Sequence, residues 1–368
     1  MRLSETAILP KHIMKRMPQL DAVRGLAVLA VLVHNTDKGL YTGFVSRNGW
    51  MGVDLFFVLS GFLITGILLD TKNSESYFRK FYARRCLRIW PLYYCTLLFM
   101  FVAVPLVRPS EAHQIFEPRS MPWWSYFVYL QNFLVPVITR GTGPLGVTWS
   151  LAVEEQFYLV WPLVVRFCTS KTLSRITVAV ICLDPVLRFV LVHRGFNVYP
   201  NPFCRLDGLM WGALLALVFR SEAFHREKYV ALAWVALLIA SSLAIVTADR
   251  VLWAVYSFTT LASASFVYLA LTSKNKWLQG FLSNRFLIYS GVISYGIYLL
   301  EKIPSDGLKS FHLNAHPVIV LIVTAAITYL MATLSWNFLE KPALRLKKYF
   351  EADRSVSHAT EGALAHSS

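Results

Sequence analysis

Residues 147–162 read VTWSLAVEEQFYLVWP, an apolar run of membrane-spanning character that contains two adjacent carboxylates, Glu154 and Glu155. A charge near the centre of a bilayer costs about 2.5–3.5 kcal/mol on insertion scales, so each carboxylate needs a reason to be there. Consecutive positions of an α-helix lie about 100° apart, so the two side chains face different ways. Glu154 shares a polar stripe with Ser150 and Tyr158, whereas the stripe of Glu155 is otherwise apolar. We therefore expect Glu154 to line a cavity and Glu155 to pair with a cation on another helix.

Two arginines are candidates for that pairing. Arg188 and Arg205 both lie in or beside other apolar runs. Arg188 also follows Asp184 by four positions, the spacing at which two helix residues can satisfy each other. The alternative is that both glutamates belong to a purely structural network of ion pairs.

The composition assigns the rest of the chain to the same class. The 368 residues are 56% hydrophobic and 15% charged, and the mean hydropathy is +0.49, whereas a soluble domain carries about 25% charged residues. Apolar runs of about 17–25 residues, the length of a spanning helix, recur along the sequence. The sequence therefore predicts an all-α fold, a polytopic membrane bundle of about ten helices. The predicted spans are 20–36, 51–70, 89–107, 145–165, 176–192, 203–219, 229–247, 251–272, 286–300 and 317–338.

The positive charges set the predicted orientation. The net charge is +15, but Lys and Arg flank the apolar runs, so we expect the lipid bilayer and no nucleic acid as a partner. With a cytoplasmic N-terminus, the inside segments carry 23 Lys and Arg and the outside segments carry 9. This asymmetry requires that residues 121–138, which are aromatic and contain proline, lie at the interface within an external excursion over 108–144 instead of spanning. Both termini are then cytoplasmic.

This orientation divides the chain into three parts: a cytoplasmic N-terminal segment over 1–19, a membrane domain over 20–340, and a basic and then disordered cytoplasmic tail over 341–368. Because the first segment is basic and polar, we expect no cleavable signal peptide and an uncleaved first anchor. The five cysteines lie in or beside apolar runs and lack metal-binding spacing, so we expect packing residues and no metal site.

Polar side chains recur inside the first two predicted spans. Asp21 and Arg24 are three positions apart, so they share a helix face and either neutralise each other or hold the helix at the cytoplasmic interface. His34 lies toward the external end of the same helix. Asp54 and Ser60 are the polar members of the second span. A buried Asp54 needs a hydrogen-bond donor or keeps its proton.

A basic segment follows the second span. Six cationic residues lie between Lys72 and Arg88, interleaved with aromatic residues. Such a segment is typical of cytoplasmic topology and of contact with anionic lipids. Arg85 and Arg88 are one helical turn apart, with Arg84 beside them, and they lead into a span. Two guanidinium groups on one face at the membrane surface can bind phosphates.

Taken in order, seven blocks of the chain resemble those of the acyltransferase-3 family of integral membrane O-acyltransferases. The blocks are LDAVRGLAVLAVLVHN, GVDLFFVLSGFLIT, FYARRCLRIWPLYY, VTWSLAVEEQFYLVWP, RLDGLMWGALLA, SYGIYLL and WNFLEKPALRLKK. The resemblance implies about ten membrane helices and transfer of an acyl group, often acetyl, from cytoplasmic acyl-CoA to a hydroxyl. It implies surface polysaccharides, lipid-linked saccharides, peptidoglycan or small glycosides as acceptors, and the bacterial cytoplasmic membrane as the location.

The resemblance also assigns roles to residues of this chain. The family's essential histidine falls on His34 and its upstream arginine on Arg24, and the paired arginines implicated with the donor fall on Arg85 and Arg88. The family separates its arginine and histidine by eleven positions, whereas here they are ten apart, which on a helix leaves them about 80° apart. Where the family often has a histidine after SYGIYLL, this chain has Glu301.

The remaining family positions are acidic or supporting. The acidic residue of the second helix falls on Asp54, and the glutamates fall on Glu154 and Glu155. We expect Arg205 and Asp207, in the block RLDGLMWGALLA, to support the site.

These observations predict a membrane O-acyltransferase that carries no tightly bound cofactor and takes acyl-CoA, in particular acetyl-CoA, as its donor. The basic rim would hold the phosphates, while Asp54, Ser60, Glu154 and Tyr158 would line a route for the thioester. His34 would act as general base on an acceptor hydroxyl of a saccharide, glycolipid or glycoside, since its ordinary pKa lies near working pH. The alternative is a multi-pass transporter or flippase that uses the same intramembrane charges to relay protons or bind a polar substrate.

Overall fold

The computed structural model describes residues 17–36, 43–107, 122–133, 143–221, 229–247, 251–310 and 316–351. Within these ranges the secondary structure is helical and no strand occurs, which confirms the all-α class. The longer helices are α1 (Pro18–Thr36), α3 (Met51–Asp70), α4 (Tyr77–Leu98), α8 (Thr148–Phe167), α9 (Ser170–His193), α10 (Leu206–Val218), α11 (Val230–Thr247), α12 (Leu252–Thr272) and α17 (Pro317–Ser335). The shorter elements are α2 (Phe44–Asn48), η1 (Phe99–Ala103), α5 (Val104–Val107), α7 (Trp123–Phe127), η2 (Gly143–Val147), η3 (Pro202–Cys204), α13 (Lys276–Leu282), α14 (Arg285–Val292), α15 (Ser294–Leu300), α16 (Lys302–Ser310), η5 (Trp336–Glu340), α18 (Lys341–Arg345) and α19 (Lys348–Glu351).

Six helices in the described ranges are long and apolar enough to cross a membrane, and a seventh exists if α14 and the helical stretch after it count as one span. That pair is bent by 64°, so the predicted span over 286–300 is not straight. The predicted spans over 20–36 and 145–165 are helical, as α1 and α8, although α8 carries three charged residues. In the predicted span over 203–219, the helix α10 is only 13 residues long. The chain is a multi-pass membrane protein, and the count of ten stays a prediction.

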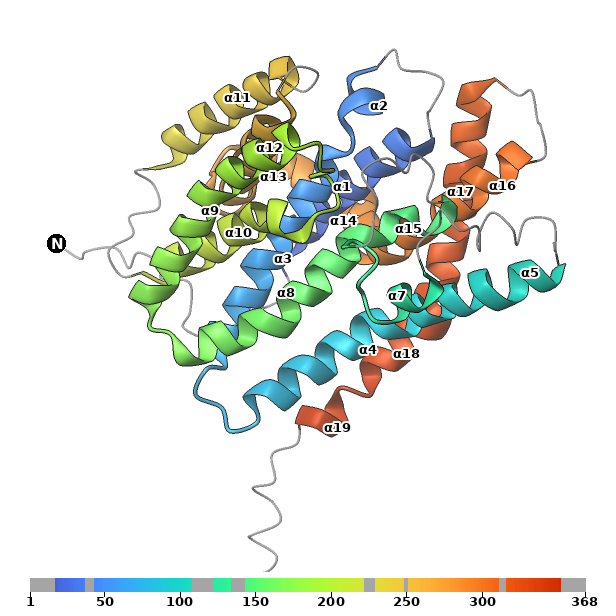
Figure 1. Cartoon of the computed structure of the whole chain (residues 1–368), viewed down its shortest axis with the longest axis horizontal. Coiled ribbons are helices and arrows are strands. Elements are labelled where there is room, and N and C mark those ends of the chain that lie inside the picture. The colour runs from blue at the N-terminus through green and yellow to red at the C-terminus, as the bar shows by residue number, and fades with distance from the viewer. Residues whose placement is uncertain are drawn as a thin grey trace, which may run out of the picture.

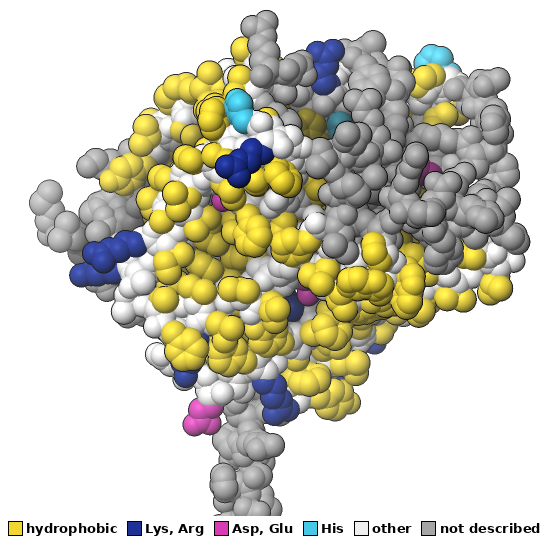
Figure 2. Space-filling model, viewed as in Figure 1, with side chains coloured by type: hydrophobic (Ala, Val, Ile, Leu, Met, Phe, Trp, Pro, Cys, Tyr) yellow, Lys and Arg dark blue, Asp and Glu magenta, His cyan; other side chains and the backbone are white. Residues whose placement is uncertain are grey.

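The outer surface fits a lipid environment. Apolar side chains cover most of the described surface in Figure 2, and charged side chains are few. On α9, for example, Leu183 is 63% exposed and Val186 is 58% exposed. Exposed apolar surface on this scale is what a membrane-facing bundle requires.

Helices α1 and α3 lie in the middle of the bundle, with α9 and α11 on one flank and α4 and α17 on the other (Figure 1). Close helix contacts depend on glycine. A Cβ on Gly61 of α3 would lie 1.9 Å from the carbonyl oxygen of Leu209 on α10, and one on Gly25 of α1 would lie 2.1 Å from that of Leu287 on α14. Glycine therefore allows close helix approach at both contacts.

The basic segment over 71–88 is not a loop. Helix α4 begins at Tyr77 and continues with Pro91 inside it to Leu98, so most of the segment forms the first turns of a spanning helix. The helix therefore begins before the predicted span over 89–107, because arginine is a good helix former and its long stem packs along apolar surface.

The aromatic segment over 121–138 does not cross the bundle in its described part. Residues 122–133 contain only the short helix α7, and the backbone is held by side chains of the neighbouring helices. Tyr93 on α4 donates a hydrogen bond to the carbonyl of Tyr126 at 2.8 Å, and Gln156 on α8 donates one to the carbonyl of Tyr129 at 2.7 Å. Irregular backbone is tolerated at such depth only where protein groups satisfy it.

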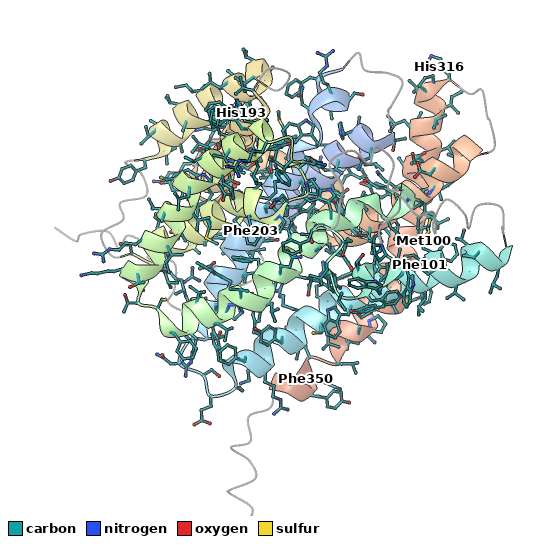
Figure 3. All side chains as sticks on the ribbon, in the orientation of Figure 1. Met100, Phe101, His193, Phe203, His316 and Phe350 are labelled. Carbon is teal, nitrogen blue, oxygen red and sulfur yellow. The ribbon has the colours of Figure 1, made fainter. Side chains whose placement is uncertain are left out.

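The C-terminal limb, which we define as residues 336–351, continues from α17. In Figure 3, His316 at the start of α17 and Phe350 in α19 lie at opposite ends of the molecule. The limb opens with the π-helix η5 and then packs α18 and α19 against α4. Arg79 on α4 places its guanidinium carbon 5.9 Å from the ring centre of Phe350. The predicted basic segment from Lys341 is thus helical, while residues 352–368 lie outside the described residues.

Candidate active site

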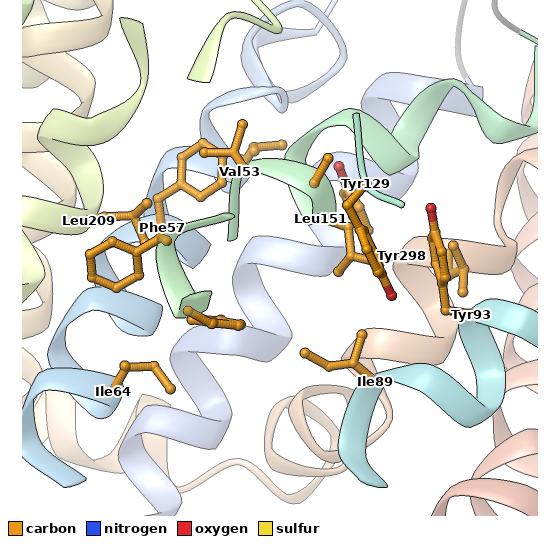
Figure 4. Packing of buried hydrophobic residues seen from close by; sticks show 14 of the residues in the cluster. Val53, Phe57, Ile64, Ile89, Tyr93, Tyr129, Leu151, Leu209 and Tyr298 are labelled. Atoms are coloured by element: carbon orange, nitrogen blue, oxygen red, sulfur yellow. The ribbon is translucent and has the colours of Figure 1, made fainter. Parts of the chain in front are cut away.

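A cavity of about 410 Å³ lies among α1, α3, α4, α8 and α15, with the C-terminal limb at one end. Phe57 of α3, Ile89 of α4 and Leu151 of α8 form part of its apolar wall (Figure 4). Its polar lining consists of Arg24, Ser60, Arg84, Arg85, Arg88, Ser150, Glu154, Tyr158, Ser294, Tyr295, Tyr298 and Lys347.

The cationic wall brings together arginines that the sequence placed on one helix face. Arg85 and Arg88 both line the cavity, as their one-turn spacing predicts, and Arg24 joins them from α1. The guanidinium carbon of Arg85 lies 5.8 Å from the ring centre of Tyr158, and that of Arg88 lies 5.2 Å from the ring centre of Trp336. Neither guanidinium forms an ion pair with any residue that the structure describes. Their charges therefore remain available to an anionic ligand.

Glu154 occupies the cavity on the predicted polar stripe. Its carboxylate accepts hydrogen bonds from the hydroxyl of Ser60 at 2.7 Å and from that of Tyr158 at 3.1 Å. Ser150, one turn earlier, also lines the cavity. The stripe read from the sequence is confirmed, and Glu154 is stabilised by two hydroxyl donors and not by a contacting cation.

Asp54 does not join this lining. Its carboxylate is fully buried and forms an ion pair with Arg205, and it accepts a hydrogen bond from the hydroxyl of Thr259 at 2.5 Å. The donor partner that a buried Asp54 needs is therefore present. The predicted polar seam was wrong at this residue, because the ring of Phe57 lies between: it lines the cavity and lies 5.6 Å from the guanidinium carbon of Arg205.

A second buried ion pair lies close to the first. Arg188 donates a hydrogen bond to Asp207 at 2.7 Å, while Asp184 lies 3.9 Å from the same guanidinium group. The predicted pair of Asp184 and Arg188 is thus present, but Asp207 makes the shorter contact. Burial raises the pKa of the neighbouring Tyr199, in the segment after α9, to about 12, so its phenol is neutral at pH 7.

The partner predicted for Glu155 was wrong. Both candidate arginines are engaged elsewhere, Arg205 by Asp54 and Arg188 by Asp207. One carboxylate oxygen of Glu155, Oε1, is fully buried without a hydrogen-bond partner among the described residues, and Trp90 lies beside the carboxylate. Long-range pairing of this kind depends on how the helices are arranged, which spacing within one helix does not specify.

His34 lies near the end of α1 and is not part of the cavity lining. Its Nδ1 is 2.7 Å from the carbonyl oxygen of Ser46 in α2. Since a carbonyl only accepts, this contact assigns the proton to Nδ1 and leaves Nε2 as the basic nitrogen. Helix α1 is a continuous α-helix, so the ten positions between Arg24 and His34 correspond to about 15 Å along its axis.

The other residues predicted on α1 lie in its N-terminal half. Arg24 faces the cavity. Asp21 lies in the first turn, where an acidic side chain complements the helix dipole, and its carbonyl oxygen would be 1.7 Å from a Cβ on Gly291. This close contact packs α1 against α14.

Sequence reasoning missed the residues that close the cavity. Tyr298 shares a hydrogen bond of 2.6 Å with the hydroxyl of Ser150 and donates one of 3.0 Å to the carbonyl of Val147. Glu301 follows three positions later, is fully buried, and accepts a hydrogen bond from Asn35, the neighbour of His34. Tyr298 thus lines the cavity, while Glu301, three residues later, contacts the residue next to His34. Tyr298 belongs to the block SYGIYLL, so the sequence contains it. The spacing of the polar residues in that block does not reveal which other helices they contact.

The limb was missed as well. Leu344 and Lys347 line the cavity, and Trp336 lies against Arg88. The block WNFLEKPALRLKK contains all three, yet its charges resemble those of an ordinary cytoplasmic flank. Among the described residues, no group of His, Cys, Asp and Glu side chains is arranged to hold a metal ion.

The family of the acyltransferase domain, type 3, matches residues 17–337 of this chain. The chain belongs to the acyltransferase-3 family. This match includes every predicted site residue, from Asp21 to Asp207, and ends just inside the C-terminal limb.

Curated relatives from Staphylococcus aureus share this region. A protein named "Putative O-acetyltransferase" from strain MSSA476 is 28% identical over 359 residues, which cover 89% of this chain and 57% of the relative. The O-acetyltransferase OatA from strain NCTC 8325 / PS 47 is 27% identical over 369 residues, which cover 91% of this chain and 58% of the relative. The chain thus spans somewhat less than three fifths of the length of these relatives. No solved structure matches it.

Proposed function

We propose that the protein is a membrane O-acyltransferase, which moves an acyl group, in particular acetyl, from acyl-CoA to a hydroxyl of a saccharide, glycolipid or glycoside acceptor. Membership of the acyltransferase-3 family supports the class, and the names of the relatives support acetyl. The observation that carries the proposal is the cavity wall itself. Arg85 and Arg88 line it without a contacting carboxylate, beside Arg24 and Arg84.

Donor binding follows from this charge distribution. Arginine forks recognise phosphate through two parallel hydrogen bonds, so Arg85 and Arg88, with Arg84, would hold the phosphates of acyl-CoA. The thioester would then lie deeper, where Ser60 and Glu154 supply polar groups in an otherwise apolar wall.

The chemical step needs a base for the acceptor hydroxyl. His34 Nε2 takes that proton while the hydroxyl oxygen forms a bond to the thioester carbonyl carbon. The bond from carbon to sulfur then breaks, and the leaving thiolate receives the proton, so the products are an O-acyl ester and free CoA. Because His34 lies about 15 Å along α1 from Arg24, the reactive end of the donor must pass Tyr298 and Ser150 to reach it.

Two acidic residues have supporting parts in this scheme. Glu154 lies in the donor cavity, where its carboxylate orients the hydroxyls of Ser60 and Tyr158 and is the alternative base. Asp54 holds Arg205, and through it the external ends of α3 and α10, so we assign it a positioning role. We place the protein in the bacterial cytoplasmic membrane with both termini inside, on the positive-charge asymmetry and on the family.

The competing function is that of a transporter or flippase. The buried pairs of Asp54 with Arg205 and of Asp207 with Arg188 favour it, because ionisable groups inside a bundle also serve proton relays. Such a protein moves its substrate without any acyl product.

The deciding experiment uses purified protein in liposomes, with labelled acetyl-CoA and a candidate glycan. Acylated glycan and free CoA in equal amounts are expected. Movement of the glycan with no ester formed would establish the transporter instead.

A further inference from the structure

The C-terminal limb contributes to the donor cavity from outside the region that the family match covers. Leu344 and Lys347 both line the cavity, yet the match ends at residue 337. The side chain of Lys347 lines the cavity and is also exposed to solvent, so it lies at the mouth of the cavity.

The limb is held firmly enough to place a side chain. The π-helix η5 puts the ring of Trp336 beside Arg88, and it buries the carboxylate of Glu340, which accepts a hydrogen bond from Ser335 at 3.0 Å. Further along, Phe350 packs on Arg79 of α4. π-helical turns of this kind are frequent at functional sites. Lys347 therefore lies between two residues of the limb, Trp336 and Phe350, that both pack against α4.

The cations of the cavity are arranged by depth. Lys347 is exposed at the mouth, whereas Arg85 and Arg88 are half-buried. Arg88 lies one turn, about 6 Å, further along α4 than Arg84. Glu154 and Ser60, which are joined by a hydrogen bond, are half-buried as well, so Lys347 is the exposed cation of a lining whose other polar groups lie farther in.

Coenzyme A carries its charges in the same order. Starting from the thioester, an uncharged pantetheine arm leads to a diphosphate, and the adenosine beyond it carries a separate 3′-phosphate. If the thioester lies near Ser60 and Glu154 and the diphosphate lies at Arg85 and Arg88, the last phosphate reaches the mouth. We infer that Lys347 recognises the 3′-phosphate of the donor, an inference that rests on the proposed function.

Binding can test this without measuring turnover. The affinities of free CoA and of 3′-dephospho-CoA are measured by calorimetry with the full chain in lipid nanodiscs at fixed ionic strength. The parent should bind CoA more tightly than 3′-dephospho-CoA. Lys347→Ala should weaken CoA about two- to fivefold, the range of an exposed ion pair, and leave 3′-dephospho-CoA unchanged. Lys347→Arg should keep the preference, because the charge remains.

Lys341→Ala is the matched control, since Lys341 is an exposed lysine of the same limb that does not line the cavity. It should bind both ligands as the parent does. Equal weakening of both ligands by Lys347→Ala, no weakening of CoA, or a parent that does not distinguish the two would overturn the inference. A parent that binds neither ligand would instead remove acyl-CoA from the proposed function.

Discussion

Arg85 and Arg88 show at the residue scale how a membrane helix can carry charge for a ligand. Each guanidinium packs on an aromatic ring, Tyr158 or Trp336, and neither is neutralised by a carboxylate of the described chain. Arg85→Ala or Arg88→Ala removes a charge-assisted hydrogen bond, which contributes about 1.5–3 kcal/mol. The KM for acyl-CoA should then rise about 10- to 150-fold, with the KM for the acceptor little changed.

Initial-rate kinetics at varied acyl-CoA concentrations check this prediction. Arg175→Ala is the control, because Arg175 is an exposed arginine of α9 that lies outside the cavity lining. An unchanged KM for acyl-CoA in both cavity variants would place the phosphates elsewhere.

At the scale of helices, Tyr298 joins α15 to α8 through its hydrogen bonds to Ser150 and to the carbonyl of Val147. We propose that this contact separates the cavity from the end of α1 that carries His34, so Tyr298→Phe should let water reach the thioester more often. One lost hydrogen bond contributes about 0.5–1.5 kcal/mol, so free CoA formed without ester should rise about two- to tenfold. Tyr329→Phe breaks a similar contact with Ser290 away from the cavity, at 2.6 Å, and should not uncouple the reaction. A ratio of CoA to ester that stays at one in Tyr298→Phe would refute the separating role.

The contact between α3 and α10 gives a stability prediction at the same scale. A Cβ on Gly61 would lie 1.9 Å from the backbone of Leu209, so Gly61→Ala must push the helices apart. Overpacking of this kind costs about 1–3 kcal/mol, and the melting temperature in detergent should fall by several degrees. Gly280→Ala meets nothing within 4 Å and should melt with the parent. Equal melting of the two variants would show that this helix contact is not close.

For the whole molecule, the distribution of Lys and Arg predicts that 71–76 faces the cytoplasm and 108–144 faces outward. A single cysteine introduced at Glu75, an exposed position, should resist an impermeant thiol reagent in intact cells, while one at His113 should react. The five native cysteines are replaced first. Labelling in the reverse pattern would invert the topology.

Local patterns in the sequence predicted features that depend on a single helix. The spacing of Ser150, Glu154 and Tyr158 predicted a polar stripe, and that of Arg85 and Arg88 predicted a shared face, because helical periodicity alone sets both. Partners on other helices were not predictable in this way.

The pairing of Arg205 with Asp54, and not with Glu155, illustrates the difference. It follows from the close contact of α10 with α3, which sequence spacing does not reveal. The position of Lys347 in the cavity lining was not predicted for the same reason, since it depends on how the C-terminal limb packs on α4.

The central claim is that His34 is the base of an acyl transfer. The most direct measurement is the rate of ester formation by His34→Ala in liposomes supplied with labelled acetyl-CoA and glycan, alongside the affinity of the same protein for CoA. Loss of a general base costs about 10²–10⁴ in rate. CoA affinity should stay within twofold of the parent, because His34 does not line the cavity and lies about 15 Å along α1 from Arg24, which does. Ester formation by His34→Ala at the parent's rate would contradict the account and make Glu154 the next base to test.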